Sequence, residues 1–371
     1  MKNLNICIIL KDNLIILLEF EIGVTMFDKK TPKAKKNKKP VSQRIAAWKT
    51  WKKVVLGFGG TMCILFMVLA VYAVATLAKL DIDKLDQDPT ALGIVNTDEH
   101  SDDIINIALF GIDTTSSNFI GRSDAIVILT IDKKHKDVKL SSVMRDAYVE
   151  IEGHGTDKIN HAYAFGGAQL AVKTLNQNFG LDIKDYVSIN FSNIEKLVDA
   201  LGGITMNVTS NDRAEANKHI RTLANQRGIT ADLIDSTGEV ELSGMQALGM
   251  LRIRKGNTGG DYGRTDRHRE FLTAVYEKLK TKNVLEYPAI INELLPLVKT
   301  SLTYDKILSL GTEAASKIDT IEQVRFPTDN ALKNGYGGKM ISGVWYLTFD
   351  KDICVSEMKN FIYNDVKPVV E

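Results

Sequence analysis

The chain has 371 residues, of which 44% are hydrophobic and 25% are charged, a composition typical of globular proteins with one large domain or two small ones. Its formal net charge is only +1, but the charge is unevenly distributed: residues 1–78 contain 13 Lys and Arg against 4 Asp and Glu, a net of +9, and the remainder contains 34 against 42, a net of −8. This asymmetry predicts two parts in different compartments, and the acidic remainder argues against nucleic acid as a partner.

The N-terminal part, residues 1–53, is predicted to be a basic arm. The apolar runs within residues 1–25 are interrupted by charged residues, which argues against a membrane span there, and Met26 is a second candidate start of the chain. The stretch that follows is rich in Lys and contains two Trp residues suited to a membrane interface. We expect this arm to stay in the cytoplasm and to contact anionic lipid headgroups.

Residues 54–78, VVLGFGGTMCILFMVLAVYAVATLA, contain no charged residue. About 20 apolar residues are enough for a helix to cross the hydrocarbon core of a bilayer. The segment is too long for a removable signal peptide and lacks a small-residue cleavage site. It is therefore predicted to be a single transmembrane anchor, with the N-terminus in the cytoplasm and residues 79–371 outside the cell.

Residues 79–103 are acidic, polar and weakly periodic, which predicts a linker, and residues 104–371 are predicted to form the extracellular domain. Short apolar runs predict strands at 104–113, 125–132, 138–143, 186–191, 204–208 and 344–350, the second and third as a pair. Helices are predicted at 160–179 (ended by Gly180), 192–201 (capped by Ser192), 243–252 and 264–281. Strands alternating with helices predict an α/β/α sandwich with a central mixed sheet.

Three polar clusters lie at the predicted ends of these elements, where ligand sites of α/β sheets gather. They are Asp113, Arg122 and Asp124; Arg145, Asp146, Lys158 and Asn160; and the arginine-rich stretch RIRKGNTGGDYGRTDRHREFL, 252–272. Each cluster also has a structural interpretation: the aspartates could cap turns, Arg145 and Asp146 could form a local ion pair, and the arginines could cover a solvated helix face.

Phosphate is the ligand that these clusters favour together. Guanidinium groups match phosphate oxygens with two parallel hydrogen bonds. A helix beginning near Arg264 would place Arg264, Arg267 and His268 on one side of its first turns, at an end that attracts anions. Asp113 and Asp124 could hold Mg²⁺, with Mn²⁺ as a second candidate, because Mg²⁺ binds through one or two carboxylates and substrate phosphates. The sequence therefore predicts a pyrophosphate site.

Several motifs in series also resemble the LytR-CpsA-Psr family: FGIDTTSSNFIGRSDAIVILTID, LSSVMRDAYVEI, DKINHAYAFGGAQLAVKTL, DYVSINF, LVDALGGI and LSGMQALGMLRIRKGNTGGDYGRTDRHREFL. They run in order from about residue 104 to residue 275. The resemblance implies a membrane-anchored phosphotransferase on the outer face of a Gram-positive cell. Such an enzyme moves a phosphate-containing glycopolymer, a teichoic acid or capsular polysaccharide, from a polyprenyl-pyrophosphate carrier to a peptidoglycan hydroxyl with the help of Mg²⁺.

Carried over by motif, the resemblance places Asp113 and Asp124 near the metal, and Gln169 and Asp261 at further motif positions. One position departs from the family pattern: His268 stands where a Gln usually follows the arginine matching Arg267. The resemblance assigns pyrophosphate binding to Arg122, Arg145, Lys158, Arg252, Arg254, Arg264 and Arg267, and Gln169 is grouped with them.

The family's fold also encloses the polyprenyl tail, and the apolar runs 125–131 and 271–279 could line that space or could be plain core. In the implied reaction the peptidoglycan hydroxyl attacks phosphorus and polyprenyl phosphate leaves. Asp124 or Asp146 takes the hydroxyl proton, Arg267 binds the pyrophosphate as charge develops on the leaving phosphate, and Arg145 is counted among the catalytic residues. Two alternatives remain open: a non-catalytic module that binds the lipid carrier or the cell wall, and a transcription attenuator.

Overall fold

The computed structural model describes residues 9–10, 14–15, 82–95, 103–114, 119–253, 260–317 and 320–368. The chain divides into two units, residues 1–69 and residues 70–371. In the first, β1 (Ile9–Leu10) pairs antiparallel with β2 (Leu14–Ile15). The predicted anchor, 54–78, lies outside the described residues. Within the described ranges, no helix has the length and apolar character needed to cross a bilayer.

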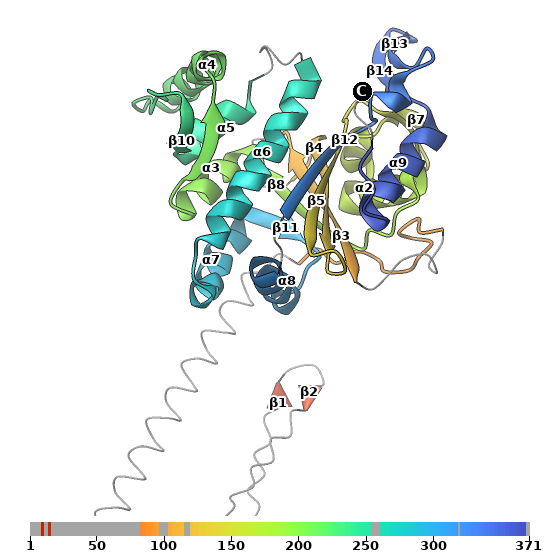
Figure 1. Cartoon of the computed structure of the whole chain (residues 1–371), viewed down its shortest axis with the longest axis horizontal. Coiled ribbons are helices and arrows are strands. Elements are labelled where there is room, and N and C mark those ends of the chain that lie inside the picture. The colour runs from red at the N-terminus through yellow and green to blue at the C-terminus, as the bar shows by residue number, and fades with distance from the viewer. Residues whose placement is uncertain are drawn as a thin grey trace, which may run out of the picture. The chain divides into compact units, whose positions relative to one another are not determined.

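The second unit is built on a six-stranded mixed sheet with the order β11-β8-β3-β4-β5-β12 (Figure 1). β8 runs parallel to β3 and β12 runs parallel to β5, while the other three neighbouring pairs are antiparallel. The strands are β3 (Ile104–Ile112), β4 (Ser123–Asp132), β5 (Asp137–Val143), β8 (Asp185–Asn190), β11 (Val298–Thr300) and β12 (Thr320–Phe326).

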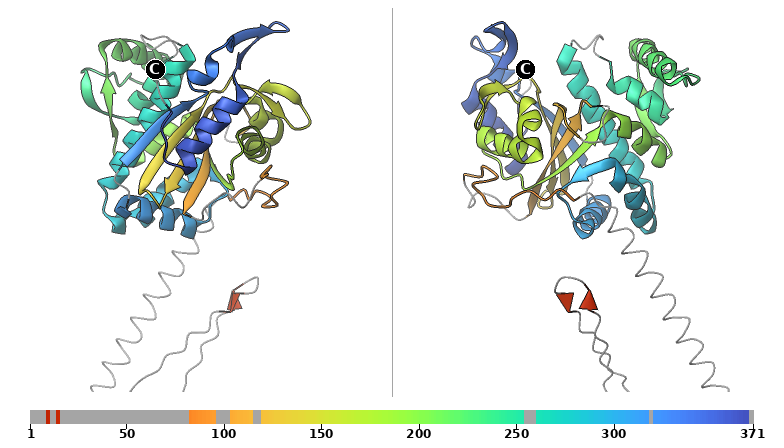
Figure 2. Two further views of the ribbon diagram at one scale, coloured as in Figure 1. Left: turned by 45° about the vertical axis from the view of Figure 1, so that its right-hand side comes forward. Right: turned by 180° about the vertical axis from the view of Figure 1, so that it is seen from behind.

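Both faces of this sheet are apolar because side chains alternate along each strand and helices cover both sides. In β3, Ala108 and Phe110 belong to the core beneath α2 (His161–Phe179) and α9 (Lys351–Tyr363), whereas Ile107 and Leu109 face the opposite side. Figure 2 shows the two groups of helices on either side of the sheet. The second group comprises α3 (Phe191–Ala200), α5 (Gly244–Leu251), α6 (Gly260–Lys280), α7 (Tyr287–Leu294) and α8 (Tyr304–Lys317).

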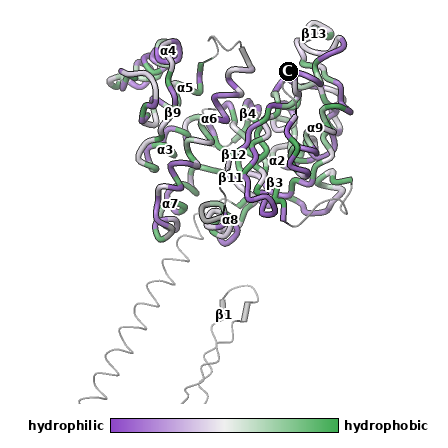
Figure 3. Tube along the Cα trace, in the orientation of Figure 1, coloured by the Kyte–Doolittle hydropathy of each residue, from purple (hydrophilic) through white to green (hydrophobic). Residues whose placement is uncertain are grey.

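The remaining elements are peripheral to the sheet. α4 (Ser210–Arg227) packs on α5 and is largely hydrophilic in Figure 3. Three antiparallel strand pairs stand apart from the sheet: β6 (Tyr148–Ile151) with β7 (Gly155–Lys158), β9 (Ile204–Val208) with β10 (Gly238–Leu242), and β13 (Gly337–Ile341) with β14 (Val344–Thr348). Short 3-10 helices cover Val284–Glu286, Leu295–Leu297 and Asn330–Leu332.

The predicted mixed sheet with helices on both faces is confirmed, but several local predictions are wrong. The cap of α3 is Asn190, whose side chain accepts from the Asn193 amide, rather than Ser192. α6 begins at Gly260, four residues before Arg264. The strands at 204–208 and 344–348 lie outside the central sheet: β9 pairs with β10, which follows α4, and β14 pairs with β13 in a hairpin, and the apolar pattern revealed neither partner.

The predicted linker is also partly wrong. Its described part, 82–95, packs on the domain: Leu92 is fully buried, and Ile82 bridges to Thr300, the last residue of β11. Asn176 on α2 donates a hydrogen bond to the Leu92 carbonyl at 2.8 Å. A few buried side chains are enough to fix a segment whose overall composition is polar.

Candidate active site

The predicted polar clusters meet along one edge of the sheet, which we call the site edge. At this edge Ile112, the last residue of β3, pairs with Ser123 at the start of β4 and with Asn190 at the end of β8. Phe326 at the end of β12 pairs with Val143 at the end of β5. The turns that follow β3 and β5 and precede β4 therefore project to the same side.

Asp124 is the centre of a network of buried charges at this edge. Its side chain is almost fully buried and accepts hydrogen bonds from Arg145 Nη1 at 2.6 Å and from Asn160 Nδ2 at 3.1 Å. Arg145 Nε lies 3.3 Å from Asp146 Oδ2, and Lys158 Nζ lies 2.7 Å from Asp146 Oδ1. Each buried carboxylate is thus paired with a cation, as burial of charge requires.

α6 contributes the second half of the site. Arg264 and His268 line a small polar pocket of about 10 Å³ together with Asp124 and Arg145. Because α6 begins at Gly260, Arg264 lies in its second turn, so the prediction that it stands at a helix N-terminus is wrong. Arg264 and His268 therefore reach the site from the side of α6 rather than from its N-terminus. Their burial, rather than the helix dipole, sets their position.

Arg267 makes a contact that the sequence did not predict. Its Nη2 lies 3.0 Å from Asp212 Oδ1 in the first turn of α4, and the arginine is 7% exposed. Asp212 was missed because the polar segment 210–227 gave no apolar periodicity. Thr209 followed three residues later by Asp212 is a helix-start signal that could have located α4.

His268 is the most unusual side chain of the site. It is 8% exposed, and its Nε2 has no hydrogen-bond partner within the described structure. Burial, and then the positive charge of Arg264, lower the pKa of His268 to about 3, so the ring is neutral. Other buried polar atoms at this edge also have no partner within the described ranges: Ser123 Oγ, Ser142 Oγ and Asn160 Oδ1. Buried groups of this kind indicate a ligand or water that completes their hydrogen bonds.

The other predicted residues are placed less centrally. Asp113 and Arg122 are exposed, and the Asp113 amide donates to the Arg122 carbonyl at 3.0 Å across the turn before β4. Arg252 is the partly buried C-cap of α5. Arg254 and the side chain of Asp261 lie outside the described residues.

Gln169 is not brought to this cluster. Its Oε1 accepts from the Asp86 amide at 2.8 Å, and its Nε2 donates to the Ala91 carbonyl at 3.0 Å. The residue lies beyond a kink in α2, where Gly166 and Gly167 leave the helical conformation. Its hydrogen bonds hold the segment 82–95 against α2, so the grouping of Gln169 with the pyrophosphate-binding residues does not fit the structure.

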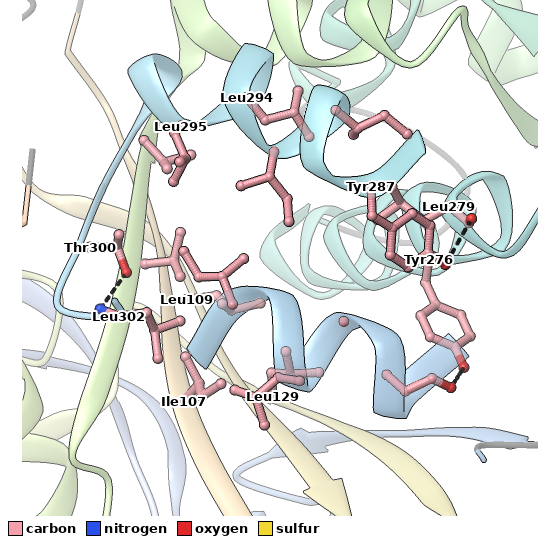
Figure 4. Close-up of a pocket in the computed structure, with 18 of the residues that line it drawn as sticks. Ile107, Leu109, Leu129, Tyr276, Leu279, Tyr287, Leu294, Leu295, Thr300 and Leu302 are labelled. Carbon is pink, nitrogen blue, oxygen red and sulfur yellow. Dashed lines mark hydrogen bonds between the residues drawn. The ribbon is translucent and has the colours of Figure 1, made fainter. Parts of the chain in front are cut away.

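A long apolar cavity opens behind the charged cluster, between the sheet and α6, α7 and α8. Its inner part, about 160 Å³, shares Ala125, Val127 and His268 with the polar pocket. Its outer part, about 310 Å³, shares Leu109, Val187 and Val298 with the inner part. Figure 4 shows apolar side chains from β3, β4, α6 and α7 pointing into the outer part.

The two apolar runs that the sequence offered as a lining do line this cavity. Alternate residues of 125–131, namely Ala125, Val127, Leu129 and Ile131, contribute from β4. The run 271–279 contributes Phe271, Leu272, Val275, Tyr276 and Leu279 from α6. The alternation of strand side chains explains why only every second residue of the first run takes part.

A separate group of possible metal ligands lies at the opposite end of β4. Among the described residues, Asp132, His135 and Asp365 have ligand atoms within 4.8 Å of one another. The fully buried Lys139 ammonium lies 2.8 Å from Asp132 and 2.9 Å from Asp365. An ammonium at the centre of the group supplies the positive charge that a metal would otherwise bring.

The profile of the LytR_cpsA_psr family matches residues 66–361. The chain belongs to this family. A relative from Bacillus mycoides, polyisoprenyl-teichoic acid--peptidoglycan teichoic acid transferase TagU, is 31% identical over 297 residues, covering 79% of this chain and 90% of the relative. The TagU of Enterococcus faecalis is 33% identical over 235 residues, covering 62% and 72%.

Solved structures show the same fold. TagT bound to LI-WTA is similar with a TM-score of 0.59 and 27% identity, covering 76% of this chain and 98% of that chain. TagT with bound octaprenyl pyrophosphate lipid is similar with a TM-score of 0.55 and 25% identity, covering 75% and 98%.

Proposed function

We propose that this protein transfers a phosphate-containing glycopolymer from a polyprenyl-pyrophosphate carrier to a sugar hydroxyl of peptidoglycan. The observation that carries the proposal is the continuity between the charged pocket around Asp124 and the apolar cavity, which share Ala125, Val127 and His268. Such a site suits a ligand with an anionic head and a long apolar tail. The teichoic acid transferase names of the relatives favour a teichoic acid over a capsular polysaccharide as the glycopolymer.

The pyrophosphate would lie among the cations of the site edge. Arg145, Arg264 and Arg267 are guanidinium groups suited to phosphate oxygens, and Lys158 adds a point charge. His268 Nε2 lacks a partner within the described structure and faces the junction between head and tail. A neutral imidazole there can hydrogen-bond to a phosphate oxygen without adding a further charge beside Arg264.

The reaction is a displacement at phosphorus. The acceptor hydroxyl attacks the phosphorus that bears the glycopolymer, its proton passes to Asp124 or Asp146, and polyprenyl phosphate leaves with the electron pair of the broken P–O bond. Arg145 touches both carboxylates and can therefore hold either against the reacting hydroxyl. Phosphoryl-type transfers depend mainly on such positioning and on stabilisation of charge.

Mg²⁺, or Mn²⁺, is proposed as the cofactor, with Asp113 and Asp124 as its protein ligands. The donor set fits: each Asp124 oxygen accepts one hydrogen bond in the structure and retains a lone pair, and Asp113 is exposed at the end of β3. When bound, the metal would neutralise charge on the pyrophosphate.

We further propose that residues 54–78 anchor the enzyme in the cell membrane, with its catalytic domain outside the cell. Ile82, the first described residue of the second unit, bridges to Thr300, which itself lines the outer part of the cavity. A chain leaving the bilayer would thus enter the domain beside the tail end of the cavity. Support would come from an alkaline phosphatase fusion after Glu371 that is active in a bacterial host, and activity only in fusions before Val54 would refute this topology.

The transfer itself can be measured with a synthetic polyprenyl-pyrophosphate glycan, peptidoglycan fragments and the full chain in detergent. We expect release of polyprenyl phosphate in step with glycan attached to the acceptor. Octaprenyl pyrophosphate should stabilise the protein against heat more than inorganic pyrophosphate does, because only the former fills the cavity. Equal stabilisation by the two ligands together with no transfer would reject the proposed function.

A further inference from the structure

The hairpin β13–β14 stands at the site edge and carries an exposed apolar surface. Figure 2 shows it projecting away from the sheet, on the side of α2 and α9. Met340 is 65% exposed, Val344 43%, and both Trp345 and the neighbouring Tyr336 41%. Apolar residues clustered in this way on a soluble surface commonly mark an interaction site.

The base of the hairpin is joined to the turn after β5, which carries Arg145 and Asp146. The Leu347 amide donates to the Asp146 carbonyl at 2.9 Å, and Leu347 forms an isolated bridge with Ala147. Tyr346 packs against Tyr148 with ring centroids 4.6 Å apart. The hairpin is therefore held in register with Asp146, one of the two candidate bases.

Lys158 connects the aromatic surface to the charged cluster. Its ammonium lies 2.7 Å from Asp146 and within 6 Å of two ring centroids, at 5.9 Å from that of Trp345 and at 5.8 Å from that of Tyr346. One side chain thus separates the exposed indole of Trp345 from the carboxylate. A ligand lying on this indole would lie close to Lys158 and Asp146.

Trp345 packs against the backbone of its own hairpin even though it is 41% exposed. A Cβ on Gly338 would lie only 2.8 Å from Trp345 Cζ2 and 2.9 Å from its Nε1, so the indole lies directly against the backbone of Gly338. A rigid aromatic side chain supplies contact area at low cost in conformational entropy. Glycine at position 338 is the residue that permits this close approach.

We propose that the β13–β14 hairpin binds the acceptor glycan, with a pyranose ring stacked on Trp345 and its hydroxyl directed toward Asp146. The C–H groups on one face of a pyranose carry partial positive charge and pack on the negative face of an aromatic ring. This inference rests on the proposed transferase function and adds a binding site for its second substrate.

The geometry of the reaction favours the acceptor over the donor polymer as the occupant. In a displacement at phosphorus the attacking and leaving oxygens lie roughly in line. The leaving polyprenyl phosphate extends into the cavity on the α6 side of the sheet, so the attacking hydroxyl arrives from the other side. The hairpin lies on that other side, with α2 and α9 (Figure 1).

A lipid surface is a less suitable occupant because of where the chain enters the domain. Ile82 bridges to Thr300 on β11, the strand at one side of the sheet, whereas the hairpin is joined to Ala147, which follows β5. In the strand order, β11 and β5 are separated by four interstrand spacings, roughly 19 Å across the sheet. The hairpin therefore lies across the sheet from the point at which a chain anchored by residues 54–78 would enter the domain.

The first test measures transfer by the full chain as the concentrations of acceptor and donor are varied separately. Trp345→Ala should raise the KM for the peptidoglycan fragment by roughly threefold to tenfold, the range expected for loss of one aromatic stacking contact. The kcat and the KM for the polyprenyl-pyrophosphate glycan should change little, and Trp345→Phe should be intermediate. Ile229→Ala, an exposed apolar residue beyond α4, is the control that should match wild type.

An unchanged KM for the acceptor, or a rise confined to the donor, would overturn the proposal. Thermal melts of each variant exclude unfolding as the cause of any change.

The second test measures binding without catalysis, which separates failure of this inference from failure of the proposed function. The chain has three Trp residues, so Trp48→Phe and Trp51→Phe together leave Trp345 as the only indole. We expect saturable fluorescence changes when peptidoglycan fragments are added in the absence of donor. A response to anionic lipid vesicles alone, or to the donor glycan alone, would refute the acceptor assignment even if transfer is observed.

Discussion

The neutral state of His268 has a measurable consequence for stability. In the unfolded chain a histidine titrates near 6.5, whereas burial beside Arg264 lowers the pKa of His268 to about 3 in the folded protein. Between these values the unfolded state binds a proton that the folded state does not bind, so stability falls as the pH is lowered. At pH 5 this single group should cost about 2 kcal/mol of the free energy of unfolding relative to pH 7.5.

The assay is urea denaturation of wild type and His268→Gln at pH 7.5, 6 and 5, with a chelator present so that metal binding does not contribute. The Gln variant keeps a polar side chain but has no proton to gain, so wild type should lose about 2 kcal/mol more than the variant between pH 7.5 and pH 5. His154→Gln, at an exposed position, should follow wild type. Parallel curves for wild type and His268→Gln would refute the conclusion that burial keeps this imidazole neutral.

Three further predictions concern the metal, the cavity and the arginine of α6. Chelation should abolish transfer by the wild-type protein, and Mg²⁺ or Mn²⁺ should restore it. Asp124→Asn should stay on the order of 10²-fold slower with either ion. Undiminished transfer by this variant would show that Asp124 is not a metal ligand. Gly311→Phe on α8 should fill open space in the cavity and stabilise the helix by about 0.5 kcal/mol through its higher helix propensity. Calorimetry should then show that octaprenyl pyrophosphate binds roughly tenfold more weakly. An unchanged affinity would mean that the polyprenyl tail lies elsewhere. Arg267→Lys should lower kcat by on the order of 10²-fold because Lys lacks the two parallel N–H donors of a guanidinium. Asp212→Asn, which changes the partner of Arg267 on α4, should retain most activity. Equal losses of activity in the two variants would mean that Arg267 has a purely structural role.

The parts of the structure that the sequence predicted are those governed by local pattern. β3 and β4 were found because their apolar runs face helices on both sides, and the end of α2 was found because Gly180 adopts the left-handed conformation that closes a helix. Asp124, Arg145, Asp146 and Lys158 were grouped correctly by proximity because the strand ends that carry them lie at one edge.

The parts that were missed depend on contacts between residues distant in sequence. α4 is too polar to show a periodic apolar face, yet its Asp212 pairs with Arg267, 55 residues later in the chain. Gln169 belongs to a motif, but the kink at Gly166 and Gly167 turns the helix beyond it toward residues 86–91. Neither placement follows from composition or spacing, because each depends on which surface the segment packs against.

The arrangement of the two faces of the sheet explains why the charged cluster lies where it does. The apolar cavity occupies the α6–α8 face, and the aromatic hairpin lies on the face of α2 and α9. A long lipid and a glycan cannot share one face without competing for the same surface. The lipid-linked donor and the acceptor glycan can meet only beyond the strand ends, where a side chain is accessible from both faces of the sheet. Asp124, which contacts the pocket that leads to the cavity, and Asp146, which is joined to the hairpin, are bridged there by Arg145. Movement of the Arg145 guanidinium would therefore alter the binding of both substrates. Arg145→Lys should change the KM values for donor and acceptor together, whereas Trp345→Ala should change the KM for the acceptor alone.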